Sequence, residues 1–340
     1  MKITIKEIAA IAGVHRATVD KVLHHREGVS DEVRSKVQRI IDEAGYKPNP
    51  LGKALKHANK KVVIAAVLVK VDALTELRKG IEKAYDDYKK FNMEIQYHMV
   101  DYPQAEKQAE ILSGLNPENC AGVVVSPLSH PAVEAALKKL KDAAIPVVTL
   151  NIDCTDKENR LCFVGQDMEK AGQTAARMAD ILLGSKGQVA ILGSNSHLFS
   201  VAEREKGFRH YMRENAPHIS VLPSIETNED PALTFQKTTE LLQKAPPDLL
   251  FVTGGSAAEA ARALQNLPSV PQRPFFICFE RYPAIESLLH NSIITCTISS
   301  DLTTQGHEAI KQLFEFIMFN RRPTQCSFYM PIGIILRENL

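Results

Sequence analysis

The segment 16–23 places basic side chains beside small ones on a stretch of about two helical turns. It contains Arg16, Ala17 and Lys21, and it follows a short segment that ends at Gly13. An arginine can donate two hydrogen bonds to O6 and N7 of a guanine, and an alanine methyl can touch the methyl group of a thymine. A lysine can reach a guanine or a phosphate. These residue types therefore suit contact with DNA, provided that neighbouring elements present them.

Two short helices on either side of Gly13 would present this segment. A third helix is predicted to begin at Ser30, with Asp31 and Glu32 at its positive end, and to stop at Gly45. We interpret residues 1–46 as a small all-α helix-turn-helix head, in which the second helix enters the major groove. The apolar residues that recur at helical spacing around the turn are Ile5, Ile8, Ala9, Ala12, Val19, Val22 and Leu23.

Residues 61–340 alternate between strand and helix patterns. Val62–Val69 is an almost unbroken apolar run, typical of a strand that is covered on both faces. The alternation predicts doubly wound parallel sheets, and the number of units predicts two α/β lobes. The later strands are expected at Met93–Val100, Gly122–Ser126, Pro146–Asn151, Gln188–Leu192, Asp248–Thr253, Phe275–Phe279 and Ile293–Ile298. The helices are expected at Glu76–Phe91, Gln104–Leu115, Pro131–Ala143, Met168–Leu183, Glu203–Asn215, Pro231–Gln243, Ser256–Asn266, Tyr282–His290 and Thr303–Phe319.

Polar residues follow several of these strands where each strand ends. The carboxyl ends of parallel strands meet at one edge of a sheet, and ligands of such folds bind there. Carboxylates and amides suit hydroxyl groups, because a hydroxyl both donates and accepts a hydrogen bond. Each residue taken alone is also a common turn or loop cap. The candidates are Asp72, Ser126, Asn151, Asp153, Gly254, Gly255, Glu280 and Asp301.

Charge is divided unevenly along the chain. Residues 1–61 hold 13 Lys and Arg against 7 Asp and Glu, whereas residues 62–340 hold 28 against 33. A basic head on a mildly acidic body indicates that only the head meets polyanions. The 6 cysteines are scattered without paired spacing, which favours reduced thiols in a cytoplasmic protein and no metal site. We also expect no membrane span, no signal peptide and no cofactor.

The whole chain resembles the LacI/GalR family of bacterial transcription regulators. The resemblance rests on Thr4-Ile5-Lys6-Glu7-Ile8-Ala9, on Ala12-Gly13-Val14, on Thr18-Val19-Asp20-Lys21-Val22-Leu23 and on Gly45-Tyr46-Lys47-Pro48-Asn49. It implies a body like the type I, ribose-binding class of periplasmic sugar-binding proteins. The segment 329–339 is similar to the common C-terminal strand of the family.

The resemblance assigns DNA contacts in the head and linker. Arg16, Ala17 and Lys21 match the positions that reach base edges, with the choice of base left open. Leu55 matches an apolar wedge of the linker that enters the minor groove. The alternative is that Leu55 packs on its dimer mate, and both contacts can hold at once. The complete set of expected DNA contacts is Thr4, His15, Arg16, Ala17, Thr18, Lys21, Asn49 and Leu55.

The resemblance also implies an effector site between the lobes. Arg204 matches an arginine that binds ring hydroxyls in sugar-binding relatives. Gly254-Gly255 stand where the family often has Asn-Asp, so a hydroxyl-binding carboxylate is missing at that point. Residues 71–74 replace an aromatic pair, and the chain has no tryptophan. A sugar, a sugar derivative, a polyol or another small polar metabolite therefore remains open as the effector.

We expect three parts: residues 1–46, a linker at 47–60, and a body at 61–340. The first lobe is predicted to contain 61–163 and 293–326, and the second lobe 164–292 and 327–340. The function indicated is that of an effector-controlled regulator, most simply a homodimeric repressor of a pseudo-palindromic operator. An α/β enzyme or a solute-binding protein with an incidental basic N-terminus is the alternative. Against an enzyme, the chain lacks GxSxG, GxxxxGK[ST], GxGxxG after the first strand, and HExxH.

Overall fold

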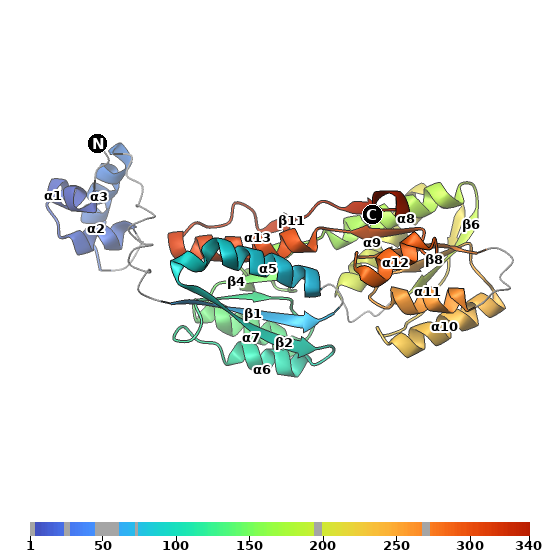
Figure 1. Ribbon diagram of the computed structural model, residues 1–340. Helices are drawn as coiled ribbons and strands as arrows, with labels where there is room; N and C mark the ends of the chain where they lie inside the picture. The colour runs from blue at the N-terminus through green and yellow to red at the C-terminus, as the bar shows by residue number, and fades with distance from the viewer. Residues whose placement is uncertain (1–3, 24–27, 45–60, 72–73, 194–198, 267–272) are drawn as a thin grey trace. The chain divides into compact units, whose positions relative to one another are not determined.

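The computed structural model describes residues 4–23, 28–44, 61–71, 74–193, 199–266 and 273–340. The chain forms two compact units, which divide between Lys56 and His57 (Figure 1). The expected linker at 47–60 lies outside the described residues. No described helix is both long enough and apolar enough to cross a membrane.

The head consists of α1 (Ile5–Ala12), α2 (Arg16–Leu23) and α3 (Asp31–Glu43) around one apolar cluster. Gly13 ends α1 in the left-handed conformation, with φ of 66°, which turns the chain sharply into α2. Ile8, Val19, Val22 and Val37 are fully buried between the three helices. The helical spacing of these residues therefore fixes which side of α2 faces the core and which side faces outward.

The first lobe is built on a parallel six-stranded sheet in the order β11-β5-β4-β3-β1-β2. Helix α13 packs against β3, β4, β5 and α5, so it covers one face of this sheet, as Figure 1 shows. The strands are β1 (Val62–Lys70), β2 (Met93–Asp101), β3 (Gly122–Val125), β4 (Val147–Asn151), β5 (Cys162–Gly165) and β11 (Ser327–Tyr329). The helices are α5 (Leu74–Tyr88), α6 (Ala105–Ser113), α7 (Pro131–Asp142) and α13 (Leu302–Phe319).

The second lobe has its own six-stranded sheet, in the order β12-β10-β9-β8-β6-β7. All pairs are parallel except β10 with β12. The strands are β6 (Gly187–Leu192), β7 (Ile219–Val221), β8 (Leu249–Val252), β9 (Phe275–Phe279), β10 (Cys296–Ser299) and β12 (Gly333–Ile335). The helices are α8 (Met168–Leu183), α9 (Phe199–Asn215), α10 (Pro231–Lys244), α11 (Ala257–Gln265) and α12 (Pro283–His290). The expected fold class, a helix-turn-helix head with a two-lobed body of type I, is confirmed.

Two expected lobe boundaries are corrected by the strand pairing. Residues 296–299 were expected in the first lobe, but β10 pairs with β9 of the second sheet. Residues 327–329 were expected in the second lobe, but β11 pairs with β5 of the first sheet. The C-terminal strand expected over 329–339 is divided into β11 and β12, and Pro331, which has no backbone N–H to donate, lies between them. The residue pattern of a strand can indicate that the strand is buried, but it does not indicate which of the two sheets the strand joins. Both boundaries were therefore misplaced.

Glycines let one pair of helices in each lobe approach closely. In the first lobe, a Cβ on Gly306 of α13 would lie 2.1 Å from the carbonyl oxygen of Leu77, and one on Gly80 of α5 would lie 1.9 Å from that of Thr303. In the second lobe, a Cβ on Gly172 of α8 would lie 1.9 Å from the carbonyl oxygen of Arg204. No side chain fits at these points without separating the helices.

Replacing Gly306 by alanine should therefore separate α5 from α13. We expect Gly306→Ala to lower the free energy of unfolding by about 1–3 kcal/mol, because a methyl group must be forced into a packed backbone contact. Urea denaturation followed by circular dichroism measures the change. Gly114→Ala is the matched control, since its Cβ would meet nothing closer than 3.5 Å. Equal stability of the two variants would contradict the close approach.

Candidate DNA-reading helix and effector site

The outward side of α2 carries the residues expected to read bases. Arg16, Ala17 and Lys21 are exposed, while Val19 and Val22 of the same helix are buried in the head core. Thr18 is partly buried at the start of the helix. The buried valines hold the helix so that its basic face points to solvent. The structure thus brings the three predicted base-reading residues together on one face.

Two other expected contact residues shape the ends of helices. The Thr4 hydroxyl accepts a hydrogen bond from the Glu7 amide at 3.3 Å, and the Thr4 amide donates to the Glu7 carboxylate at 2.7 Å. This capping box begins α1, and its hydrogen bonds lower the pKa of Glu7. His15 is exposed, and its carbonyl accepts from the amide of Thr18 at 2.8 Å. Asn49 and Leu55 lie outside the described residues.

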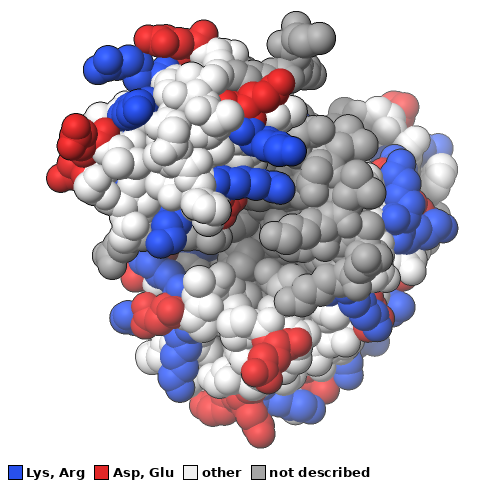
Figure 2. Space-filling model, turned by 90° about the vertical axis from the view of Figure 1, so that its left-hand side faces the viewer, with Lys and Arg blue, Asp and Glu red and all other residues white. Residues whose placement is uncertain are grey.

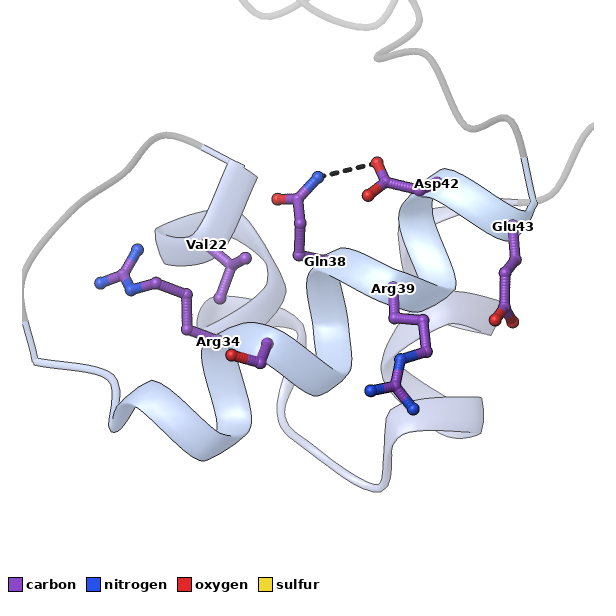
Figure 3. Close-up of a pocket in the computed structure, with 7 residues that line it drawn as sticks. Val22, Arg34, Gln38, Arg39, Asp42 and Glu43 are labelled. Carbon is purple, nitrogen blue, oxygen red and sulfur yellow. Dashed lines mark hydrogen bonds between the residues drawn. The ribbon is translucent and has the colours of Figure 1, made fainter.

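On the described part of the head, positively and negatively charged side chains are mixed. Figure 2 shows basic and acidic side chains interspersed on the face that it displays. A shallow groove between α2 and α3 also mixes signs; in Figure 3, Gln38 and Asp42 point to one side of α3, joined by a hydrogen bond of 2.9 Å, and Arg39 points away from them. The mixed charges do not by themselves mark a DNA-binding surface, so the prediction of DNA contact rests on the exposed residues of α2. The groove is lined by Val22, Arg34, Ser35, Gln38, Arg39, Asp42 and Glu43.

Arg204 anchors a polar cluster at the carboxyl ends of β8 and β9 in the second lobe. Its Nη2 donates to Glu280 Oε1 at 2.6 Å, and its Nη1 donates to the carbonyl of Thr253 at 3.1 Å. The guanidinium also lies 3.9 Å from the ring centre of Phe279, within range of a cation–π interaction. Arg204 is only 6% exposed, so these contacts, and not water, stabilise its positive charge.

Backbone geometry directs two of the expected effector residues away from their strands. Asn151 ends β4 with φ of 65°, and Glu280 follows β9 with φ of 67°. Residues other than glycine seldom adopt this left-handed conformation, which costs on the order of 1 kcal/mol or more. Ala144 and Asn320 adopt the same conformation at ordinary turns, so it turns the chain at both strand ends without by itself marking a binding site.

A glutamate that the sequence analysis missed fills the space left by the glycine pair. Glu229, from the segment between β7 and α10, accepts a hydrogen bond from the Gly255 amide on its Oε2 at 2.6 Å. A Cβ on Gly254 would lie 1.8 Å from Glu229 Oε1, so only glycine leaves room for this carboxylate. A polar residue in a loop carries no periodic signal. The sequence gives one indication: two glycines at the end of a buried strand often leave space for another part of the chain or for a ligand.

Several polar atoms of this cluster are buried without a hydrogen bond to any described residue. They are Arg204 Nε, Glu229 Oε1 and Glu280 Oε2. Burial raises the pKa of both carboxyl groups, and the positive charge of Arg204 only partly opposes that shift. Burial likewise lowers the pKa of Arg204. The cluster therefore presents polar groups that a bound ligand could satisfy.

The first-lobe candidates mostly have partners within their own lobe. The Asp153 carboxylate accepts from Arg160 at 2.6 and 2.7 Å, from the Thr149 hydroxyl at 2.7 Å and from the Cys154 amide at 3.0 Å. The Ser126 hydroxyl donates to the carbonyl of Leu150 at 2.8 Å.

Asp301 caps α13 by accepting from the amide of Thr304 at 2.8 Å. Asp72 lies outside the described residues. Among the described residues, no three side chains of His, Cys, Asp or Glu gather as a metal site requires.

Comparison with known proteins agrees with this arrangement. The profile of the bacterial regulatory proteins of the lacI family matches residues 4–49, and that of a periplasmic binding protein domain matches residues 67–320. The chain belongs to the periplasmic binding protein domain family through its body, and its N-terminal residues carry the DNA-binding domain of the lacI family of bacterial regulatory proteins. It is a DNA-binding transcriptional regulator whose body has the periplasmic-binding-protein fold, as the sequence predicted.

LacI-family regulators are also among its curated relatives. The HTH-type transcriptional regulator DegA of Bacillus subtilis is 27% identical over 270 residues, which cover 77% of each chain. The regulator TreR of Escherichia coli is 33% identical over 131 residues, or 36% of this chain and 38% of TreR.

Solved structures share the fold of the body. A putative LacI transcriptional regulator from Bacteroides fragilis superposes with a TM-score of 0.71 at 23% identity, covering 82% of this chain and 98% of that one. GanP, a glucose-galactose binding protein from Geobacillus stearothermophilus, reaches a TM-score of 0.73 at 20% identity and covers 82% and 99%. At these identities the likeness shows the fold alone.

The ion pair of Asp153 and Arg160 predicts a structural role for Asp153. The side chain of Arg160 is only 1% exposed, so Asp153→Ala would leave a buried charge without its partner. We expect the free energy of unfolding to fall by about 3–5 kcal/mol. Chemical denaturation measures this loss. Asp142→Ala, which removes an exposed carboxylate paired with Lys138, is the control and should change stability by less than about 1 kcal/mol.

Proposed function

We propose that a small polar metabolite controls how tightly this regulator holds its operator. The effector binds at the strand ends of the body, where Arg204, Glu229 and Glu280 supply the contacts from the second lobe. Asn151 faces it from the end of β4 in the first lobe. The observation that carries the proposal is the buried Arg204–Glu280 pair with its unpartnered polar atoms. An effector that prefers one lobe geometry shifts operator affinity, and the coupling is reciprocal.

At the DNA, we propose that two heads of a homodimer bind the half-sites of a pseudo-palindromic operator. The exposed face of α2 supports this reading, since Arg16 and Lys21 can reach base edges there. Two-fold symmetry of the protein then requires two-fold symmetry of the site. The simplest outcome of such binding is repression, in the cytoplasm where the DNA lies. The relatives named as regulators favour this role over that of an enzyme.

Selection from random DNA with the full-length chain tests the proposal. We expect an enriched consensus with two inverted half-sites, and an affinity that falls steeply with salt as counterions are released. The affinity for that consensus is then measured with and without sugars, amino sugars, sugar acids, sugar phosphates and polyols. A consensus without inverted symmetry would refute the dimeric reading. An affinity that no compound changes would refute effector control.

Arg16→Ala should weaken binding to the selected operator by about 1–3 kcal/mol, because a bidentate contact to a base is lost. Binding to unrelated DNA should change much less, so the ratio between the two affinities falls. Fluorescence anisotropy at fixed salt measures both affinities. Lys186→Ala removes one exposed positive charge from the body and serves as the control. Equal losses on both DNAs would make Arg16 a phosphate contact.

A further inference from the structure

The second lobe assembles two carboxylates around one guanidinium. Glu280 bonds Arg204 directly at 2.6 Å, and the negative charge of Glu229 also acts on Arg204. Arg204 is the one cation, among the residues that the structure describes, whose charge acts on either carboxyl. Two ionised carboxylates beside one guanidinium would give the cluster a net negative charge. Burial opposes this by raising the pKa of both glutamates, and a second cation at this place would stabilise their ionised forms.

This charge balance depends on Gly254 and Gly255. The glycines remove side chains from the end of β8, and Glu229 enters from another loop to lie against them. The carboxylate is thus restored at this point of the lobe, but from a different part of the chain. It is held by the Gly255 amide through Oε2, and Oε1 has no described partner.

Arg204 is poorly placed to receive an anion. Its two terminal nitrogens already donate to Glu280 and to the Thr253 carbonyl, and Phe279 lies against the plane of its guanidinium. A ligand phosphate or carboxylate would add a further negative charge beside two carboxyl groups in a medium of low dielectric constant, which is unfavourable. A neutral polyol can donate to the carboxylates but leaves the excess charge in place.

We propose that the effector is a small hydroxylated molecule that carries a protonated amine, and that Glu229 is the residue that selects the amine. The ammonium donates to Glu229 Oε1 and Glu280 Oε2, the two carboxylate atoms that lack partners among the described residues. Its charge balances the second carboxylate as Arg204 balances the first. This inference rests on the proposed effector function and adds the charge class of the effector.

The test uses the full-length chain and probes that share a hexose ring and differ in one substituent, which is neutral, cationic or anionic. Glucose, galactose and mannose are compared with glucosamine, galactosamine and mannosamine, and with the corresponding uronic acids and 6-phosphates, by thermal shift and calorimetry at pH 7. We expect at least one amino sugar to bind at least about tenfold more tightly than its neutral parent, and the anionic members to bind more weakly still.

Two variants assign the preference to Glu229. Glu229→Gln should reduce the affinity for the amino sugar at least about tenfold and leave that for the neutral parent within about threefold. Gly254→Ala should act in the same direction, because its Cβ would displace the carboxylate. Glu226→Gln, an exposed glutamate of the same loop, is the control and should bind as the original protein does.

The proposal fails if a neutral or anionic sugar binds as tightly as its amino counterpart, or if no amino sugar binds at all. The ranking on the unaltered protein decides this even if a variant does not fold. It also fails if Glu229→Gln folds and keeps the preference. Effector control itself is judged separately: a neutral or anionic ligand that changes operator affinity would preserve the proposed function while removing the amine.

Discussion

The close crossing of α8 and α9 is the constraint on which the proposed effector site depends. Gly172 and Gly207 bring the two helix backbones together, so that the carbonyl of Arg204 lies directly against α8. This contact fixes the height of α9 over the second sheet and aims Arg204 at the ends of β8 and β9. A long side chain could otherwise sample many rotamers. Here the guanidinium is confined between Glu280, the Thr253 carbonyl and the ring of Phe279.

The path of the chain explains how such a site can influence distant elements. The strand β10 belongs to the second sheet, yet it leads directly through Asp301 into α13, which covers the first sheet. The chain passes between the sheets again after β5 and between β11 and β12. A ligand that contacts strand ends in both lobes therefore acts on segments that the two lobes share. Such shared segments are a physical route for coupling between ligand and DNA.

The sequence predicted the elements whose residues repeat with a clear period. Val19 and Val22 set the helical phase of α2, and this phase correctly left Arg16 and Lys21 exposed. The alternation of apolar runs and amphipathic helices likewise predicted the two sheets, with bounds as close as those of β9 and α8. The strands β5 and β7, of four and three residues, were not predicted. Runs this short show no period, and the four-residue strands β3, β8 and β10 were predicted only as parts of longer apolar segments.

The proposed effector site was only partly predictable, for a different reason. Arg204 and Glu280 were identified, but their mutual bond joins residues 76 positions apart and leaves no mark in the local pattern. Asp153 was chosen as a strand-end carboxylate, and the structure gives it a buried partner in Arg160, seven residues onward in a loop. Glu229 was overlooked because its importance depends on the absence of side chains at Gly254 and Gly255. Contacts of this kind become visible only in three dimensions.

The glycine pair has a consequence for how such regulators diversify. A carboxylate at a strand end is tied to the sheet, whereas Glu229 comes from residues 226–230, which lie between the bridge of Ile225 to β6 and the start of α10 and belong to no strand. Gly254 and Gly255 leave space for a side chain of this loop, and Arg204 is held in place by Glu280 and the Thr253 carbonyl. The group that fills the space can therefore change without a change in Arg204. Under the proposed function, a change in this loop would alter the ligand preference while the contacts of Arg204 with Glu280 and Thr253 remain.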